Sequence, residues 1–351
     1  MFAILQVRCR GGHRSSMAWR WPLLLLMGLW GMGSVPTALQ AEESAAAQQT
    51  EKADSAAPVL IGFPQDTMAN DWRAAQVQEV ATALSRHAGV RFAFTDAQGE
   101  AARQAVDLER LVEQGAKVII TSPRDCGLMT PVVNAAHARG IPVVLLTRRI
   151  LNEGYTTFIG ADDREIGVQA AHAIADALGG QGRVVMLRGV EGTTTAAQRS
   201  AGFLDTLARH HPRVQVVADV VANYLRHDAI LAMERILREG TAIDALFAQS
   251  DSMAVGARIA LKAAGRDPKD LVIVGIDFIP EAREALLAGE QTATFTYPTA
   301  GLQGAEVALR LLRGETVPRE IRVPFVKVTR ANAASVPTVF ETPWALGVNR
   351  P

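Results

Sequence analysis

Short apolar runs alternate with longer amphipathic segments through most of this 351-residue chain. The apolar runs are rich in Val, Ile and Leu, and we predict strands at residues 59–63, 90–94, 117–121, 142–146, 156–160, 183–187, 214–221, 245–248, 272–276, 292–296 and 321–328. Most of them are separated by segments with helical periodicity, and we predict helices at residues 72–87, 101–114, 196–210, 228–239, 252–264 and 301–312. Gly closes several of these segments, as in "HAG", "EQG" and "LAG".

This alternation predicts the fold class. Strands that are joined through helices pair in parallel, and the helices then cover both faces of the sheet. About ten strands are more than a single sheet usually holds. We therefore predict an α/β protein with two lobes, each a doubly wound parallel sheet. Ligands of such sheets bind beyond the carboxyl ends of the strands, so function should be sought there.

The first 41 residues have the pattern of a cleavable secretory signal. They contain four Arg and no acidic residue, and the apolar run "WPLLLLMGLWGMG" is short for a membrane span. Small residues suit cleavage after Ala41, so we predict a signal peptide at 1–41 and a flexible, polar leader at 42–57. An uncleaved anchor is the alternative, and a start at Met17 would shorten the signal.

Charge and motif content argue against several classes of protein. The formal net charge is zero, which argues against a nucleic-acid-binding protein. Cys126 is the one cysteine after residue 41, so no internal disulfide is expected, and its thiol is interpreted as buried or incidental. The seven His residues show no metal-ligand spacing, and neither GxSxG nor a phosphate-binding Gly motif occurs. We therefore expect no enzyme, no metal site and no cofactor.

The segment "PQDTMANDWRAA" at residues 64–75 follows the first predicted strand and carries Gln65, Asn70, Trp72 and Arg73. Asn70 or Asp71 suits the N-cap of the next helix. Trp72 lies off the apolar stripe of that helix, and Arg73 occupies a first turn where the helix dipole disfavours a cation. A ligand site explains both, with a ring that stacks on a sugar face and a guanidinium that donates to hydroxyls. A surface Trp beside a solvated Arg is the alternative.

Other polar side chains follow other predicted strands. They are Asp96 in "TDAQ", Asp125 in "SPRDCG", Arg148 in "LLTRR", Tyr224 in "ANYLR", Ser250 in "AQSD" and Asp277 in "GIDF". Asp96 and Asp277 each suit either a helix cap or a ligand acceptor. Arg199 faces away from the apolar stripe of residues 196–210, and periodicity alone predicts an exposed side chain.

In their order, the segments resemble the periplasmic sugar-binding proteins of the ribose and galactose type, which feed ABC importers. The resemblance rests on "NDWRAA", "LVEQGAKVIITSPRD", "ARGIPVVLLTRR", "IGADDREIGVQAA", "RSAGF", "LFAQSDSMAVGARIAL" and "VGIDFIPEAREALLAGEQTATFTYPTAGLQGAE", and it covers about residues 58–330. It implies the type I periplasmic binding protein fold, in which three crossover strands form a hinge. We expect a first lobe of residues 58–160 and 298–318, a second of 161–297 and 319–335, and a surface extension at 336–351.

The resemblance also implies the roles of site residues. Trp72 and Tyr224 would face each other across the sugar, while Arg73, Arg148 and Arg199 would donate and Asp96 and Asp277 would accept. Ser250 stands where ribose binders usually carry Asn. Thr147 stands where the family often has Asp, and Thr296–Tyr297 lie near the place of its Gln, so Asp96 or Asp125 is expected to compensate. These differences imply a ligand other than plain ribose, and the Trp72–Arg73 pair resembles the galactofuranose-binding branch.

The implied function is that of a monomeric receptor in the periplasm, which captures a sugar or polyol and delivers it to a membrane ABC permease. A sensory module for a membrane histidine kinase or chemoreceptor is the alternative. A transcriptional repressor with the same lobes would need an N-terminal helix-turn-helix, where this chain has its apolar signal. An enzyme would need a nucleophile or a metal set that the sequence does not offer.

Overall fold

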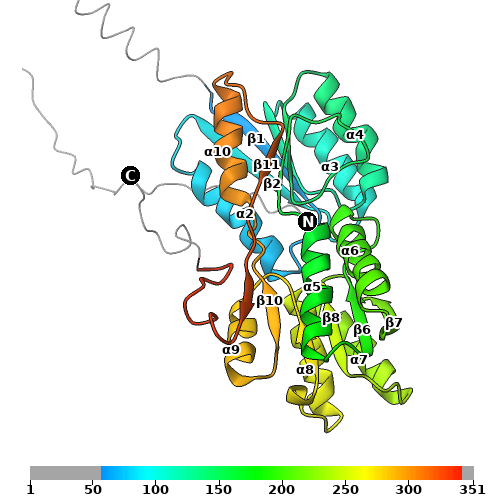
Figure 1. Ribbon diagram of the computed structural model, residues 1–351. Helices are drawn as coiled ribbons and strands as arrows, with labels where there is room; N and C mark the ends of the chain where they lie inside the picture. Colours follow the sequence, from blue (N-terminus) through cyan, green and yellow to red (C-terminus); the bar gives the residue numbers. More distant parts are fainter. Residues whose placement is uncertain (1–56, 342–351) are drawn as a thin grey trace, which may run out of the picture. The chain divides into compact units, whose positions relative to one another are not determined.

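The computed structural model describes residues 57–341, which form two lobes, each built on a six-stranded sheet (Figure 1). The predicted signal peptide, nearly all of the predicted leader and residues 342–351 lie outside this range. Among the helices within it, none has the length and apolar character needed to cross a bilayer.

The first lobe comes from two separate parts of the chain. Its elements are β1 (Val59–Gln65), α2 (Asp71–Leu84), β2 (Val90–Asp96), α3 (Ala101–Glu113), β3 (Val118–Thr121), α4 (Cys126–Ala138), β4 (Val143–Leu146), β5 (Thr157–Gly160), α10 (Gly301–Leu312) and β11 (Glu320–Arg322). The sheet has the order β11-β5-β4-β3-β1-β2, and its strand pairs are parallel. Figure 1 shows α2 and α10 on one side of this sheet and α3 and α4 on the other.

The second lobe repeats this architecture. Its elements are α5 (Asp163–Ala177), β6 (Gly182–Arg188), α6 (Thr194–His210), β7 (Val214–Val221), α7 (Arg226–Arg238), β8 (Ala245–Ala248), α8 (Asp251–Ala263), the 3-10 turn η1 (Pro268–Asp270), β9 (Val272–Val274), α9 (Pro280–Ala288), β10 (Ala293–Phe295) and β12 (Lys327–Thr329). The sheet order is β12-β10-β9-β8-β6-β7, and β12 runs antiparallel to β10 while the other pairs are parallel. The predicted two-lobed α/β fold is confirmed.

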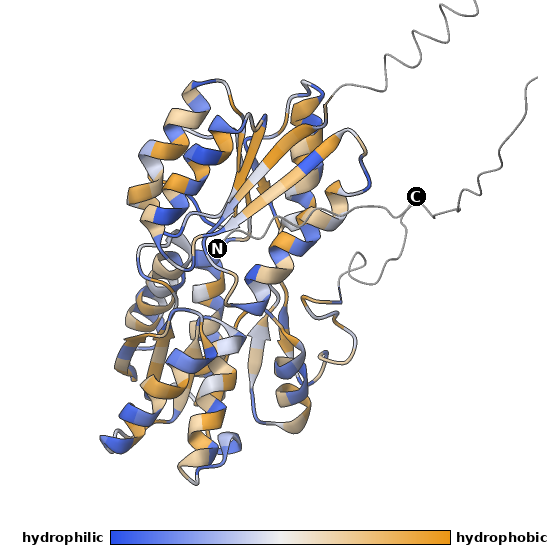
Figure 2. Cartoon of the chain, turned by 180° about the vertical axis from the view of Figure 1, so that it is seen from behind, coloured by the Kyte–Doolittle hydropathy of each residue, from blue (hydrophilic) through white to orange (hydrophobic). Residues whose placement is uncertain are grey.

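Each sheet has an apolar core on both faces. In β6, Val184 and Met186 pack toward α5 and α6, whereas Val185 and Leu187 pack toward α7 and α8. Successive strand residues point to opposite faces, so a strand that is covered on both sides is apolar throughout. Figure 2 accordingly shows orange along the strands and mixed colours along the flanking helices.

Three crossovers join the lobes, and they lie at residues 160–163, 295–301 and 322–327. The third differs from the expected boundary. The single strand predicted at 321–328 is two strands, because β11 pairs with β5 in the first sheet and β12 pairs with β10 in the second. Pro324 lies between them, and a residue without an N–H cannot continue a ladder there.

The segment before residue 342 packs against the second lobe. The Val339 N–H donates to the Phe278 carbonyl at 3.1 Å, and Arg283 Nη1 donates to Glu341 Oε1 at 2.8 Å. Thr338 and Val339 are buried. The prediction of a surface extension is therefore wrong for residues 336–341.

Candidate binding site

A cavity lies between the two lobes, beyond the carboxyl ends of strands from both sheets, as the doubly wound fold predicts. Its lining consists of Asp66, Thr67, Asn70, Trp72, Arg73, Thr147, Arg148, Val190, Thr195, Arg199, Asn223, Tyr224, Leu225, Ser250, Asp277 and Tyr297. The first seven belong to the first lobe, and Tyr297 lies in the second crossover. Aromatic rings, guanidinium groups and carboxyl groups thus line one cavity.

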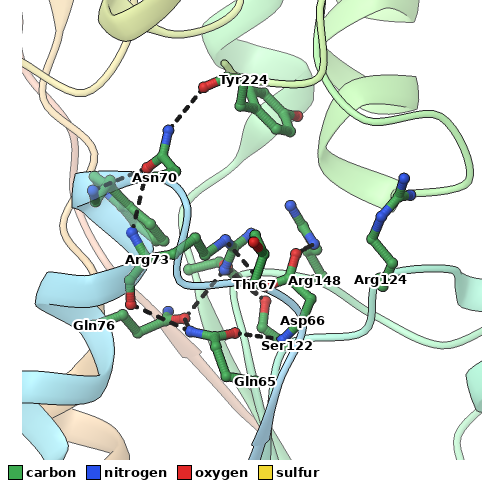
Figure 3. Close-up of polar contacts among 12 residues, drawn as sticks. Gln65, Asp66, Thr67, Asn70, Arg73, Gln76, Ser122, Arg124, Arg148 and Tyr224 are labelled. Atoms are coloured by element: carbon green, nitrogen blue, oxygen red, sulfur yellow. Dashed lines mark hydrogen bonds and ion pairs between the residues drawn. The ribbon is translucent and has the colours of Figure 1, made fainter. Parts of the chain in front are cut away.

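Asn70 begins helix α2 and also contacts the second lobe. Its Oδ1 accepts from the backbone N–H of Trp72 at 2.9 Å and of Arg73 at 3.3 Å, which is the expected N-cap. Its Nδ2 donates to the Tyr224 carbonyl of the second lobe at 2.8 Å (Figure 3). The cap therefore holds α2 and also joins the lobes.

Arg73 and Arg148 share one buried carboxylate, that of Asp66, directly after β1 (Figure 3). Arg148 Nη1 lies 2.7 Å from Asp66 Oδ2, and Arg73 Nε lies 3.6 Å from Asp66 Oδ1. Burial raises the pKa of Asp66, but the two guanidiniums outweigh it and hold that pKa below its ordinary value. Burial and the neighbouring Arg148 lower the pKa of Arg73 to about 10, so it remains a cation at neutral pH. Asp66 thus explains the cation at the start of α2.

A layer of polar side chains supports Arg73 from below. Its Nη1 donates to Ser122 Oγ at 2.9 Å and to Gln76 Oε1 at 3.1 Å. Gln65 is fully buried, and its Nε2 donates to the Arg73 carbonyl and to Gln76 Oε1, both at 3.3 Å. These contacts fix the guanidinium in one position before any ligand arrives, which lowers the entropic cost of binding.

On the second lobe, Arg199 is buried and paired. Its Nε donates to Asp163 Oδ1 at 2.8 Å, and its Nη1 donates to the Gln249 carbonyl at 2.7 Å. Burial disfavours the charged guanidinium, but Asp163 outweighs it, so the pKa of Arg199 rises above its ordinary value. The exposed side chain that periodicity predicted is wrong, because α6 packs against α5 as well as against the sheet.

Asp277 follows β9 in a strained turn. Its φ is +116° and that of Phe278 is +57°, a region that non-Gly residues rarely adopt. The buried carboxylate of Asp251 holds the turn by accepting from the Phe278 N–H at 2.7 Å. The Asp277 carboxylate makes no hydrogen bond within residues 57–341. Burial raises its pKa well above the ordinary value, although Arg199 opposes this.

The aromatic wall centres on Trp72. Its ring lies 5.7 Å from the Tyr297 ring, and its indole Nε1 donates to the Tyr297 carbonyl at 2.9 Å. The Arg199 guanidinium lies 4.4 Å from the Tyr297 ring centroid and 5.9 Å from that of Tyr224. Trp72 is thus buried and not a surface residue, and its ring lies against Tyr297. Trp72 and Tyr224 both line the cavity, and their expected places on opposite sides of a sugar stay a prediction.

The structure brings most of the predicted site residues together, but not all. The cavity is lined by Asn70, Trp72, Arg73, Arg148, Arg199, Tyr224, Ser250, Asp277 and Tyr297. Gln65 lies beneath it as described, and Ser250 also caps α8. Asp96 accepts from the Gln98 N–H and Asp125 caps α4, and neither lines the cavity. The prediction that these two carboxylates compensate for Thr147 is wrong.

Sequence reasoning missed two carboxylates. Asp66 lines the cavity and supplies the charge that we sought from Asp96 or Asp125. Its place directly after β1 was a usable signal, because its neighbours there were already candidates. Asp163 stands behind the cavity wall as the first residue of α5, where acidic residues are favoured by the helix dipole, so its local sequence does not mark it as a site residue.

Comparisons with known proteins agree on one family. Residues 61–316 match the family model described as a periplasmic binding protein domain. The ribose import binding protein of Bacillus subtilis is 30% identical over 67% of this chain and 76% of its own. The xylitol-binding protein of Mycolicibacterium smegmatis is 31% identical over 69% of this chain and 70% of its own. The solved fructose-binding periplasmic domain of a hybrid two-component system is 34% identical, with a TM-score of 0.74 over 79% of this chain and 92% of that chain.

Proposed function

Because this chain belongs to the periplasmic binding protein domain family, we propose that it captures a monosaccharide or related polyol in the cavity between its lobes and delivers it to an ABC importer. Capture takes place in the periplasm after export and proceeds by closure of the hinge. The protein acts as a monomer and a carrier, and it leaves the ligand chemically unchanged.

The cavity supports this function through its mixture of donors, acceptors and rings. A polyol needs both donors and acceptors at short range, and its C–H faces need aromatic contact. Asp277 offers a carboxyl group with no partner within the described residues, and Arg148 Nε donates no hydrogen bond there. Within the described residues, the presence of an unpartnered carboxyl group, an unused guanidinium N–H and aromatic rings in one cavity is the main observation in support of the proposal.

The charges around the cavity favour an uncharged ligand. Asp66 lies against Arg73 and Arg148, Asp163 lies against Arg199, and Asp277 adds a third carboxyl group. Each of the three guanidiniums therefore already has a carboxylate partner, and an anionic sugar would have to compete with Asp66 or Asp163 in a buried site. Each hydrogen bond between a hydroxyl and a charged group contributes about 1.5–3 kcal/mol.

The proposal is tested by calorimetric titration and thermal scans with ribose, fructose, xylitol, furanose sugars and their acid analogues. One neutral compound should saturate at one site per chain, and at 100 times its Kd it should add about 2.7 kcal/mol to the free energy of unfolding. Asp277→Asn should weaken binding about 10-fold, because Asn tolerates positive φ but its amide cannot reproduce the hydrogen bonds of the carboxyl group. Asp219→Asn, on the exposed side of β7, is the control. Conversion of a bound sugar, or no binding at all, would contradict the proposal.

A sensory role is the second candidate. The fructose-binding domain that resembles this chain belongs to a hybrid two-component system. Deletion of the gene separates the two roles. Loss of labelled-sugar uptake supports the importer, whereas intact uptake with loss of a sugar-induced response supports the sensor.

A further inference from the structure

Two adjacent carboxylates in the first crossover contact the other two crossovers. Asp163 Oδ2 accepts from the Tyr297 hydroxyl, in the second crossover, at 3.1 Å. Asp162 Oδ2 accepts from Arg322 Nη1, at the start of the third crossover, at 3.0 Å. The three connections between the lobes are therefore tied to one another through side chains.

The two carboxylates differ in burial and in what else they hold. Asp162 and Arg322 are 42% and 69% exposed, and such pairs contribute little. Asp163 and Arg199 are both 3% exposed, and their charge-assisted hydrogen bond is 2.8 Å long. Arg199 and Tyr297 line the cavity, and Asp163 does not. Asp163 thus stands directly behind two residues of the wall.

The contacts continue from Asp163 to the aromatic ring in the first lobe. Tyr297 donates its hydroxyl to Asp163 and accepts the Trp72 indole N–H at its carbonyl, 2.9 Å away. A rotation that separates the first two crossovers must break the Tyr297–Asp163 bond or pull Asp163 from Arg199. Either event changes the orientation of groups that face the cavity.

We infer that Asp163 is a positioning residue that couples the hinge to the cavity, holding Arg199 and Tyr297 in the cavity wall while it ties the first crossover to the second. The effect of Asp163 on sugar affinity rests on the proposed function, whereas its effect on the environment of Trp72 does not. The inference about Asp163 and the proposed function can therefore be tested separately.

The test compares Asp163→Asn with Asp162→Asn in the full chain. The control variant has the same chemistry one residue away, and Asn preserves the α5 N-cap that Asp162 forms. Tyr297→Phe removes only the hydroxyl and keeps the ring and the Arg199–Asp163 pair. Tryptophan emission is recorded without sugar as a difference from wild type, so that other Trp residues cancel. Affinity is measured with whichever of ribose, fructose or xylitol saturates the wild type.

Asp163→Asn and Tyr297→Phe should both shift the ligand-free emission, and Asp162→Asn should leave it unchanged. Asp163→Asn should weaken binding on the order of 30-fold or more, and Tyr297→Phe about 5-fold. The double variant should bind as Asp163→Asn alone, since both changes cut the same contact.

Unchanged emission in Tyr297→Phe, or equal affinities of Asp163→Asn and Asp162→Asn, would overturn the inference. Strictly additive losses in the double variant would also overturn it. If Asp163→Asn fails to fold, the emission of Tyr297→Phe decides. If the wild type binds no sugar, the proposed function fails, and the ligand-free emission still decides on Asp163.

Discussion

At the scale of single residues, buried charge in this protein is organised in small shared sets. Asp66 serves two guanidiniums, and all three side chains are at most 9% exposed. The main effect of such a buried carboxylate on the folded state is that it prevents two buried cations from being left without a counter-ion. Removal of its charge should therefore cost more than removal of an exposed pair.

We expect Asp66→Asn to lower the free energy of unfolding by about 3–5 kcal/mol, because Arg73 and Arg148 lose their counter-ion in a desolvated site. Asp205→Asn, which removes an exposed partner of Arg164, should change it very little. Urea unfolding at pH 7 measures both. Equal effects of the two variants would show that the Asp66 cluster is solvated.

Asp251 predicts a pH dependence of stability. Burial raises the pKa of its carboxyl to about 6, against hydrogen bonds from Gln291, Thr294 and the Phe278 N–H that lower it. The native state therefore binds more protons than the unfolded state between about pH 4 and pH 6, and this group's contribution to the free energy of unfolding falls as pH rises. With Asp251→Asn as reference, we expect the wild-type advantage to decrease by about 2–3 kcal/mol from pH 4 to pH 7. A difference that stays constant or grows over this range, in urea unfolding curves, contradicts the assignment.

At the scale of elements, the position of Arg199 depends on how closely α5 and α6 approach. A Cβ on Gly167 of α5 would lie 2.3 Å from the Arg199 carbonyl oxygen, and one on Gly202 of α6 would lie 2.1 Å from the Arg164 carbonyl oxygen. Both neighbours are backbone atoms, so neither helix can yield by a change of rotamer. The two glycines thus set the distance at which Arg199 reaches Asp163.

Gly167→Ala should push α6 away, lower the free energy of unfolding by about 1–3 kcal/mol and weaken sugar binding together with it. Gly89→Ala is the control, since a Cβ there would meet no atom within 4 Å. Thermal unfolding and calorimetric titration of both variants check this. A Gly167→Ala protein with wild-type affinity would show that Arg199 does not depend on the helix contact.

The same helix pair shows how far the sequence allowed prediction. Apolar runs located the strands because a doubly covered strand must be apolar throughout, and the site residues followed from their places after those strands. Periodicity misplaced Arg199, because one apolar stripe does not show that α6 packs on a second side. The place of Asp66 after the first strand could have marked it as a candidate, but its pairing with Arg148, 82 residues away in the chain, could not be predicted. Such a contact depends on the sheet order, which the residues near Asp66 do not encode.

At the scale of the whole described molecule, the lobes meet along a seam beside the cavity. The loop before α6 and the first residue of that helix reach the first lobe through three hydrogen bonds: Arg124 Nη1 to the Glu191 carbonyl at 3.0 Å, the Cys126 N–H to the Gly192 carbonyl at 2.9 Å, and the Arg149 N–H to Thr194 Oγ1 at 3.0 Å. Asp125, predicted to touch the ligand, lies in this seam instead. The residues of these three hydrogen bonds are not among those that line the cavity. Substitutions in the seam can therefore change how long the lobes stay together without changing the ligand's contacts.

A substitution at Gly192 tests whether the seam affects ligand release independently of the cavity contacts. Its φ is +82°, and a Cβ there would lie 2.3 Å from Asp125 Oδ2, whereas Gly265 has a φ of +72° and open space around it. Ala at either position carries a backbone strain of about 1 kcal/mol, and Gly192→Ala should lose more stability than Gly265→Ala because it also displaces the Asp125 side chain that caps α4. Only Gly192→Ala should also weaken sugar binding, about 10-fold, because a displaced seam favours the open arrangement of the lobes. Most of that change should be in the dissociation rate, which stopped-flow fluorescence resolves. If both variants release sugar at the same rate, the seam takes no part in closure, and the cavity contacts alone hold the lobes on the ligand.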